Sequence, residues 1–296
     1  MGGLSSLANN LLVPGLVAGS IYSLVGIGFC VVERTTRVLN FAHGALIMWC
    51  PMAALVADRN WHWPAAASIA LGVAAALVFG LASERLVIRP FIGRHQQLGW
   101  LLAGLGVTVI LQQLAFQPFL GQPQQFPIAL SSRPITVGGA QLTAQYLLAA
   151  GALVVVSVLV LAFYRYLRSG RELVAVGEDM DGARVVGISV GRASILASLI
   201  AALIAAVTGL VAAPIQLVSP QLGLNLTFVG FVALALGGMG QVAGAIVGGL
   251  AVGLIEQAAA VYLAQNLQNT ALFTILVLVY LVKPSGLLGR AAVREI

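Results

Sequence analysis

The sequence predicts an all-α fold, a polytopic transmembrane bundle of about eight or nine spans in which one or two helices are broken or re-entrant. The chain has 296 residues, of which 60% are hydrophobic and 8% charged, and its mean hydropathy is +1.00. Soluble globular domains are about 45–50% apolar and about 25% charged. This scarcity of charge excludes a disordered chain, a coiled coil and a nucleic-acid-binding domain, each of which needs many more charged groups.

Seven apolar runs are long enough to cross a bilayer as helices, near 9–32, 64–83, 98–118, 143–164, 193–213, 242–260 and 264–282. Two further segments are less regular. Residues 38–57 begin with polar Asn40 and His43 and contain Pro51, and 225–236 is a half-length run. We expect each of these two segments to cross, to break midway or to re-enter.

The basic residues predict the orientation. Most of the 15 Lys and Arg residues lie in 85–94, 165–192 and 283–294. Lys and Arg collect in cytoplasmic loops, so the 165–192 loop and the C-terminus are predicted to be cytoplasmic. If all nine segments cross, the N-terminus lies outside. If 38–57 only re-enters, eight spans put both termini inside, and the sequence leaves both alternatives open.

The polar stretches are too short to form a second domain. The longest are 119–142 and 165–192, so residues 1–296 are predicted to form one transmembrane domain that includes the 165–192 loop. The chain lacks the phosphate-binding pattern GxxxxGK[ST], and its one lysine, Lys283, precedes a proline. We therefore expect no ATPase activity and no catalytic residues in this chain.

The 165–192 loop holds five arginines and four acidic residues. Its middle, 171–186, is predicted to form an amphipathic helix with apolar Leu173, Val174, Val176, Ala183, Val185 and Val186. One interpretation is a solvated connector, and the other is a helix that docks on a cytoplasmic partner. The GxSxG pattern at 187–191 would need a strand-turn-helix setting and a histidine partner, so we do not expect a hydrolase.

Glycines Gly240, Gly244 and Gly248 recur at every fourth position, a spacing that lets membrane helices pack closely. The preceding Gly237-Gly238 pair predicts a discontinuous helix. Broken helices are tolerated in a membrane where they line a cavity or are buried in protein.

Polar groups at membrane depth usually face the bundle interior or water, which makes them candidates for a substrate path. The candidates are Tyr22, Asn40, His43, Gln112, Asn225 and Glu256. For His43 a buried hydrogen-bonding role is favoured over substrate contact, and Glu256 has an equal alternative at the outer interface. No His, Cys, Asp or Glu cluster has metal-ligand spacing, and Cys30 and Cys50 are interpreted as small hydrophobic residues.

Four segments carry further motifs. They are Gly-Ser-Ile-Tyr at 19–22 with Asn-Phe-Ala-His-Gly at 40–44, Ala-Arg-Val-Val-Gly-Ile at 183–188, the glycine-rich 237–256, and Lys-Pro-Ser-Gly-Leu-Leu-Gly-Arg at 283–290. In this order they resemble the permeases of branched-chain amino acid ABC importers, and among the two permease types they most resemble the LivH-type subunit.

The resemblance implies one half of an alternating-access importer in the bacterial inner membrane. Its partners would be a second permease (a LivM-type paralogue or a second copy), two cytoplasmic ATPases that bind the ATP and Mg, and a periplasmic binding protein. No cofactor is expected in this chain. The residues implied to couple to the ATPases are Glu178, Asp179, Ala183, Arg184, Gly187 and Ile188.

The substrate implied is a branched-chain amino acid, with urea, amides or aromatic acids as alternatives served by similar sequences. A different class, the ion-coupled secondary transporter, would need acids or basic relays inside the membrane. Only Glu256 is a candidate for such a relay, so this class is the less favoured alternative.

Overall fold

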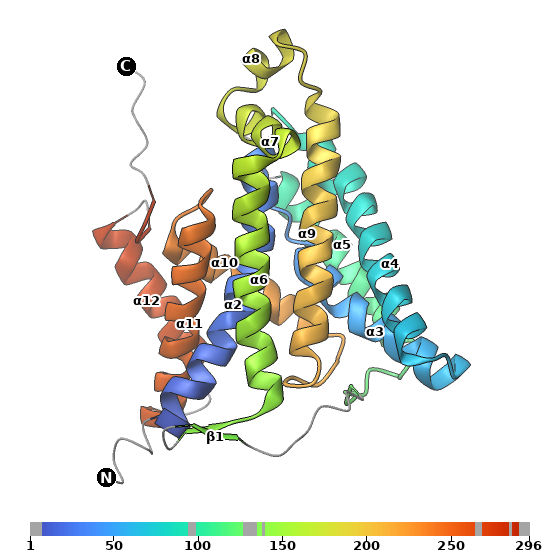
Figure 1. The fold of residues 1–296 in the computed structure, drawn as a ribbon, viewed down its shortest axis with the longest axis vertical. Coiled ribbons are helices and arrows are strands. Elements are labelled where there is room, and N and C mark those ends of the chain that lie inside the picture. The colour runs from blue at the N-terminus through green and yellow to red at the C-terminus, as the bar shows by residue number, and fades with distance from the viewer. Residues whose placement is uncertain are drawn as a thin grey trace.

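The computed structural model describes residues 8–93, 99–126, 135–137, 140–263, 268–283 and 286–289. Most of these residues are helical (Figure 1). The helices are η1 (Ala8–Leu12), α2 (Val13–Thr36), α3 (His43–Trp61), α4 (Ala65–Ser83), η2 (Glu84–Ile88), η3 (Arg89–Phe91), α5 (Gly99–Phe116), α6 (Ala144–Tyr166), α7 (Arg168–Glu178), α8 (Met180–Val185), α9 (Val190–Ala212), α10 (Leu222–Gly237), α11 (Val242–Tyr262) and α12 (Gln268–Val282).

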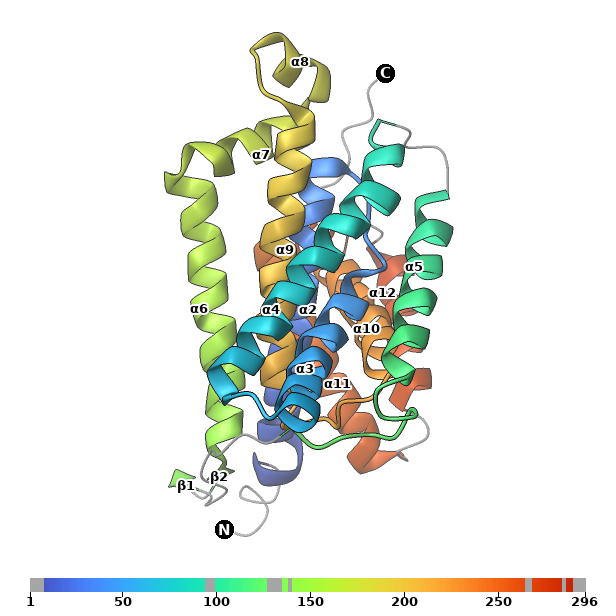
Figure 2. The ribbon, with the colours of Figure 1, turned by 90° about the vertical axis from the view of Figure 1, so that its right-hand side faces the viewer.

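A short antiparallel hairpin precedes α6. Strands β1 (Ile135–Val137) and β2 (Ala140–Leu142) pair with Thr136 opposite Gln141. The hairpin lies at the end of the bundle where the described chain begins, beside the start of α6 (Figure 2). It falls within the polar stretch 119–142 and leaves the predicted all-α class of the bundle unchanged.

Six helical segments among the described residues are long and apolar enough to cross a membrane. They are Asn9–Thr36, Ala65–Phe91, Gly99–Phe116, Ala144–Tyr166, Val190–Ala212 and Val242–Tyr262. Each corresponds to a predicted apolar run. In the seventh run, 264–282, the described residues Gln268–Val282 form the shorter helix α12, and the described residues thus form a multi-pass helical bundle.

Helix α2 is the core of the bundle. Nearly all of its residues are buried, and it contacts α6, α7, α9, α10 and α11. The most extensive contact is with α11, where a Cβ on Gly19 would lie 2.8 Å from Leu250 Cα. Gly249 and Gly253 of α11 likewise meet the backbone of α2 at Ser23 and Gly19. Glycines on both helices therefore bring the two backbones into contact, as close packing in lipid requires.

The two irregular segments meet each other inside the bundle. Residues 38–42 are buried and precede α3, which begins at His43 beside Phe29 and Gly28 of α2. The half-length helix α10 begins close to this point, since a Cβ on Gly223 would lie 2.7 Å from Gly44 O. Non-helical backbone at membrane depth is tolerated only when protein covers it or it lines a cavity, and here protein covers it.

Pro51 lies inside α3 without ending it. A proline has no N–H to give to the carbonyl four residues earlier, which here belongs to Ile47. Gly209 of α9 packs directly against Ile47 O, and a Cβ there would overlap it. The small residue on α9 thus covers the carbonyl that Pro51 leaves without its helical partner.

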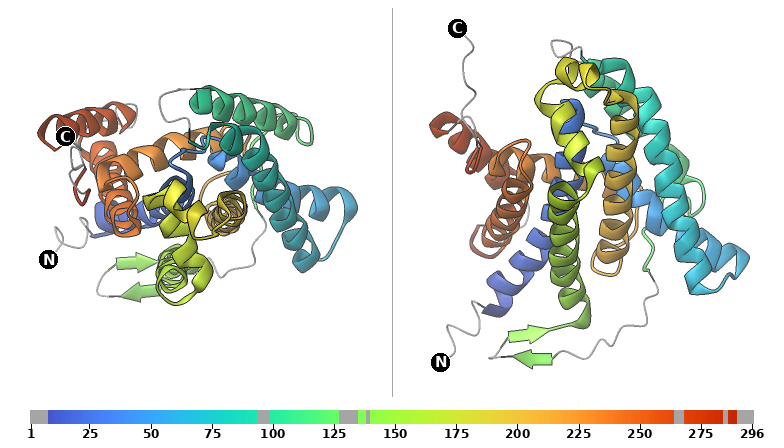
Figure 3. Two further views of the ribbon diagram at one scale, coloured as in Figure 1. Left: turned by 90° about the horizontal axis from the view of Figure 1, so that it is seen from above. Right: turned by 45° about the horizontal axis from the view of Figure 1, so that its top comes forward.

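Different segments of the chain lie at the two ends of the bundle. At one end, α7 and α8 lie over the ends of α2, α6 and α9 (Figure 3). Residues 286–289 lie at this end too, because Leu287 N and Leu288 N donate to Leu236 O and Gly237 O at 2.8 and 2.9 Å. At the opposite end, Gln257 Nε2 donates to Asn10 O at 2.8 Å.

Candidate functional site

The 165–192 loop forms two helices where the sequence predicts one. Helix α7 ends at Glu178, and Asp179 is extended, with φ −147° and ψ 107°, before α8 begins at Met180. The single helix predicted over 171–186 is therefore wrong. The break places a carboxylate at the N-terminus of α8, where it can cap the free backbone amides.

Helix α7 docks on its own bundle. Its buried residues are Gly170, Leu173, Val176 and Gly177. Gly177 packs on the backbone of Arg34 at the end of α2, and Arg37 Nε donates to Gly177 O at 2.8 Å. The chain itself thus covers Leu173 and Val176, the α7 part of the apolar face predicted for a cytoplasmic partner.

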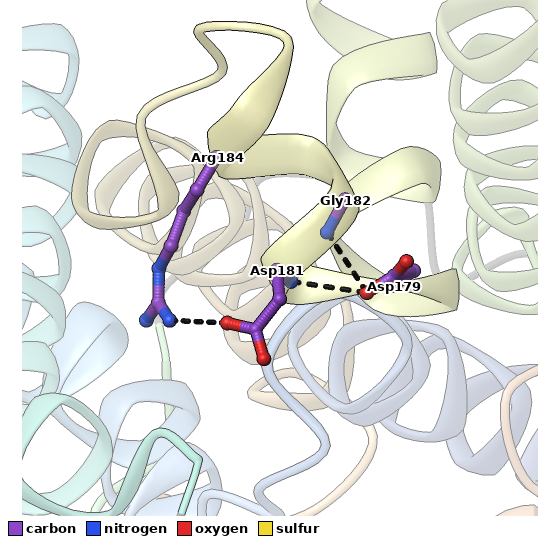
Figure 4. Close-up of polar contacts among 4 residues, drawn as sticks. All are labelled: Asp179, Asp181, Gly182 and Arg184. Carbon is purple, nitrogen blue, oxygen red and sulfur yellow. Dashed lines mark hydrogen bonds and ion pairs between the residues drawn. The ribbon is translucent and has the colours of Figure 1, made fainter.

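Asp179 caps α8 through its side chain. Its Oδ1 accepts hydrogen bonds from the backbone amides of Asp181 and Gly182, both at 3.0 Å (Figure 4). One turn further on, Arg184 Nη1 lies 2.7 Å from Asp181 Oδ1. Both side chains of this ion pair are largely exposed, so the cap is the stronger contributor to the helix.

The other end of α8 is closed by a Schellman motif. Ile188 N donates to Ala183 O at 2.9 Å, and Gly187 N donates to Arg184 O at 3.1 Å. Gly187 has φ +84°, the left-handed conformation that this motif requires and that glycine adopts without strain. The residues Ala183, Arg184, Gly187 and Ile188, picked out by sequence resemblance, therefore share one structural role as the C-terminal cap of α8.

The outer surface of α8 is apolar at its tip. Val185 and Val186 are 87% and 73% exposed, whereas Ala183 is buried in the core. Glu178 and Asp179 are also exposed. Of the predicted apolar face, Val185 and Val186 remain uncovered, and Asp181 and Arg184 of the same helix are exposed too. Exposed apolar residues rimmed by polar ones are typical of protein interaction sites.

The GxSxG pattern at 187–191 joins helix α8 to helix α9. A nucleophile elbow needs a strand before its serine, and none is present here. Among the described residues, moreover, no group of three or more His, Cys, Asp or Glu side chains could hold a metal ion.

The glycine-rich helix begins one turn later than its pattern predicts. Gly240 has φ +76° and lies in the turn before α11, so it is not on the packing face. Gly244 and Gly248 do pack on α10, and a Cβ on Gly244 would lie 2.8 Å from Gly237 O. The break at 237–241 thus separates two helices that fold back on each other, α10 and α11.

Asn40 and His43 are enclosed by their own chain. Asn40 Nδ2 donates to Ser83 Oγ and its Oδ1 accepts from Ala42 N, both at 3.1 Å. His43 is 1% exposed, lies against Gly28, and has no hydrogen-bond partner at Nε2. His43 is therefore buried as expected, whereas its Nε2 makes none of the hydrogen bonds that the favoured role includes. Asn40 fixes the turn into α3.

The other candidate path residues lie apart from one another. Tyr22 of α2 lies beside Glu256 of α11, and Glu256 Oε2 has no hydrogen-bond partner. Gln112 on α5 is half-buried and Asn225 on α10 is exposed. The predicted set therefore gives two separate pairs, Asn40 with His43 and Tyr22 with Glu256, and no single polar cluster.

The sequence is similar to known transport proteins over almost its full length. A family model described as "Branched-chain amino acid transport system / permease component" matches residues 11–282. The chain belongs to this family.

Relatives of this permease cover it nearly end to end. It is 29% identical over 296 residues to the high-affinity branched-chain amino acid transport system permease protein LivH of Salmonella typhimurium and to LivH of Escherichia coli K12, with 95% of this chain and 96% of each relative covered. The permease protein BraD of Pseudomonas aeruginosa is 28% identical over 298 residues, covering 96% of this chain and 97% of BraD. No solved structure matches the permease significantly.

Sequence reasoning missed a buried acid in this permease. Glu84 is fully buried in the π-helical turn η2, and Ser194 Oγ of α9 donates to its Oε1 at 3.0 Å. Its neighbour Ser83 accepts from Asn40. Through these hydrogen bonds, Ser83 and Glu84 connect the end of helix α4 to the turn into α3 and to the first turns of α9. The signal in the sequence was an acid directly after an apolar run, which is otherwise typical of a solvated helix end.

Proposed function

We propose that this chain is the membrane-spanning subunit of an ATP-driven ABC importer and forms half of the path for a branched-chain amino acid. The observation that carries the proposal is the family match over 11–282. The proposal includes a second permease subunit, two ATPase subunits that bind the ATP and Mg, and a substrate-binding protein outside the membrane. This chain itself contributes no catalytic residue.

The tip of α8 is the surface we assign to the ATPase. A motor that moves a permease needs a rigid contact, and α8 is capped at both ends by Asp179 and Gly187. It is also anchored to the core through Ala183. Val185 and Val186 offer an apolar contact, and Glu178, Asp181 and Arg184 are exposed charged residues of the same loop. Motion of the tip would pass through α7 to the end of α2.

We propose nine passes with the N-terminus outside. Helix α2 begins at the end of the bundle opposite α7 and α8 (Figure 1). From the end of the bundle that carries α7, residues 38–42 and α3 run back toward the opposite end. Helix α10 runs the other way and reaches the end that carries α7 at Gly237. If the irregular segments 38–57 and 225–236 each count as one pass, the 165–192 loop and residues 286–289 lie on the same side of the membrane. The excess of basic residues in that loop makes this side cytoplasmic, in a bacterial inner membrane.

For the substrate path we retain Tyr22, Gln112, Asn225 and Glu256 as candidates. Asn225 and Gln112 have exposed surface on α10 and α5, which a second permease subunit could enclose. Tyr22 and Glu256 form a polar pair between α2 and α11. Asn40 and His43 are instead assigned a structural role, because their own chain encloses both.

The test is uptake of labelled leucine by cells that carry the whole transporter, compared between Gly187→Ala and Gly191→Ala. An L-residue in the left-handed region costs about 1–2 kcal/mol, so Gly187→Ala should distort the cap of α8. Leucine uptake should fall severalfold while ATP hydrolysis continues. Gly191 has ordinary backbone angles and open space around its Cβ position, so Gly191→Ala should transport normally.

The same assay separates the alternatives. Unlabelled isoleucine and valine should compete with leucine, and urea, amides and aromatic acids should not. Uptake that stops when the membrane ion gradient is collapsed at constant ATP would identify a secondary transporter and overturn the proposal. Equal uptake and equally stimulated ATP hydrolysis in Gly187→Ala and Gly191→Ala would remove α8 as the coupling surface.

A further inference from the structure

A basic cavity lies where α2, α6 and α7 meet. Its volume is about 560 Å3, and the three helices contact one another around it. Its lining combines three arginines, a tyrosine and one acid with apolar side chains, namely Arg34, Arg165, Arg171, Tyr164, Glu178, Leu161, Val174 and Ala175. Each arginine comes from a different helix, so the fold itself brings the three charges together.

The cavity lacks a matching set of anions. Among the described residues, no ion pair joins Arg34, Arg165 or Arg171 to a carboxylate within 4.0 Å. Arg34 lies over the ring of Tyr164, with its Cζ 4.9 Å from the ring centroid. Three guanidinium groups without a carboxylate partner around one cavity indicate that an acceptor-rich ligand completes the site.

An apolar stripe continues from the cavity along α6. Leu161, Val158 and Val154 precede Arg165 on α6 at helical spacing. They are 48%, 59% and 61% exposed. Leu147 extends the stripe toward the other end of the helix and is 50% exposed. A ligand that fits both parts has an anionic head and a long apolar tail.

We propose that this cavity binds the phosphate headgroup of an anionic phospholipid, whose acyl chains lie along the exposed stripe of α6. Arg165 and Arg171 bind the phosphate, and Arg34, which lies over the Tyr164 ring, closes the site from the α2 side. Basic pockets at the cytoplasmic ends of membrane helices are suited to such headgroups. The cytoplasmic placement rests on the topology proposed above, whereas the binding chemistry does not.

The bound lipid would hold α7 against the bundle. Gly177 packs on Arg34, and Arg171 lies two turns earlier on the same helix. A headgroup shared by Arg165 of α6 and Arg171 of α7 would bridge the two helices. The lipid is then part of the support beneath α8, and loss of anionic lipid weakens that support.

The experiment is a lipid titration followed by native mass spectrometry. The full-length chain, with any subunits that copurify, is delipidated and titrated with phosphatidylglycerol or with phosphatidylcholine of the same acyl chains. The double variant Arg165→Gln/Arg171→Gln is compared with Arg168→Gln/Arg192→Gln, which removes two charges from the same region. Arg168 and Arg192 lie outside the cavity lining, and Arg168 is already paired with Glu172.

We expect wild type and the Arg168/Arg192 control to retain phosphatidylglycerol in preference to phosphatidylcholine. The Arg165/Arg171 variant should bind phosphatidylglycerol about 25-fold more weakly, since each arginine contributes roughly fivefold. If this variant elutes as a misfolded species, Arg171→Gln alone is used and a loss of about fivefold is expected.

Three results would overturn the proposal. These are equal affinity for the two lipids, equal loss in both double variants, and displacement of the lipid by inorganic phosphate at comparable concentration. The last result would identify a soluble anion as the ligand. Because the titration needs neither ATP nor an amino acid substrate, a negative result here leaves the leucine uptake test unaffected.

Discussion

At the scale of single residues, Asp179 is the most informative position. Replacing it with Ala removes the side-chain acceptor for Asp181 N and Gly182 N, which costs a helix about 1 kcal/mol. Hydrogen exchange at residues 180–186 should therefore become faster in Asp179→Ala, while the bundle keeps its protection. Asp179→Asn keeps an acceptor oxygen and should exchange like wild type.

Asp181→Ala is the control, because it removes the exposed ion pair with Arg184 and leaves the cap in place. Exposed ion pairs contribute about 0–1 kcal/mol, so its effect should be smaller than that of Asp179→Ala. Equal exchange in Asp179→Ala and wild type would show that the cap does not hold α8 in solution.

The sequence indicated which residues of the 165–192 loop matter, but it did not show what they do. The Ala-Arg-x-x-Gly-Ile pattern is recognisable by resemblance, and its spacing is also that of a helix C-terminus followed by glycine. The buried roles of Asn40 and His43 depend on Ser83 and Gly28, which are distant in the sequence. Long-range partners of this kind leave no periodic signal, which is why Glu84 was missed as well.

At the scale of helices, the space around two glycines predicts different effects of adding a methyl group. A Cβ on Gly249 would overlap the backbone and Oγ of Ser23, whereas a Cβ on Gly106 of α5 meets nothing within 4 Å. Gly249→Ala should therefore destabilise the bundle by about 1–3 kcal/mol. Gly106→Ala should be neutral or slightly stabilising, because alanine favours a helix more than glycine.

The measurement is the midpoint of thermal unfolding of the purified chain in one detergent. The Gly249→Ala midpoint should fall below wild type and the Gly106→Ala midpoint should not. A lower midpoint for Gly106→Ala alone would mean that α5 packs against protein where the structure leaves open space.

Apolar runs predicted the helices well, and their ends lie within a few residues of the expected ones. The two segments that the sequence left open share one physical cause. Helix α10 and the segment before α3 are short because each begins inside the bundle, where Gly44 and Gly223 let their backbones meet. Neither length nor hydropathy reports that another segment covers the exposed backbone. The split between α7 and α8 was missed because Asp179 fits a helix interior by period but favours an N-cap.

At the scale of the whole molecule, the few charges mark one end of the bundle. Arg34, Arg37, Arg165 and Arg171 lie together where α2, α6 and α7 meet. The sequence predicted the sidedness of that loop from its charge. It left the number of passes open, because the choice depends on whether 38–57 crosses, and a segment that enters as buried non-helical chain has no hydropathy signature.

Cysteine labelling in intact cells distinguishes the two topologies. Both topologies place exposed Val186 inside the cell, so Val186→Cys should be protected from an impermeant maleimide. Both place exposed Leu120 outside, so Leu120→Cys should react. Asn10→Cys decides between them. Nine passes put Asn10 outside, so it should react like Leu120→Cys, whereas eight passes would protect it like Val186→Cys. The native Cys30 and Cys50 are buried and should give little background. Labelling of Asn10→Cys only after the cells are opened would contradict the nine-pass arrangement and require 38–57 to re-enter.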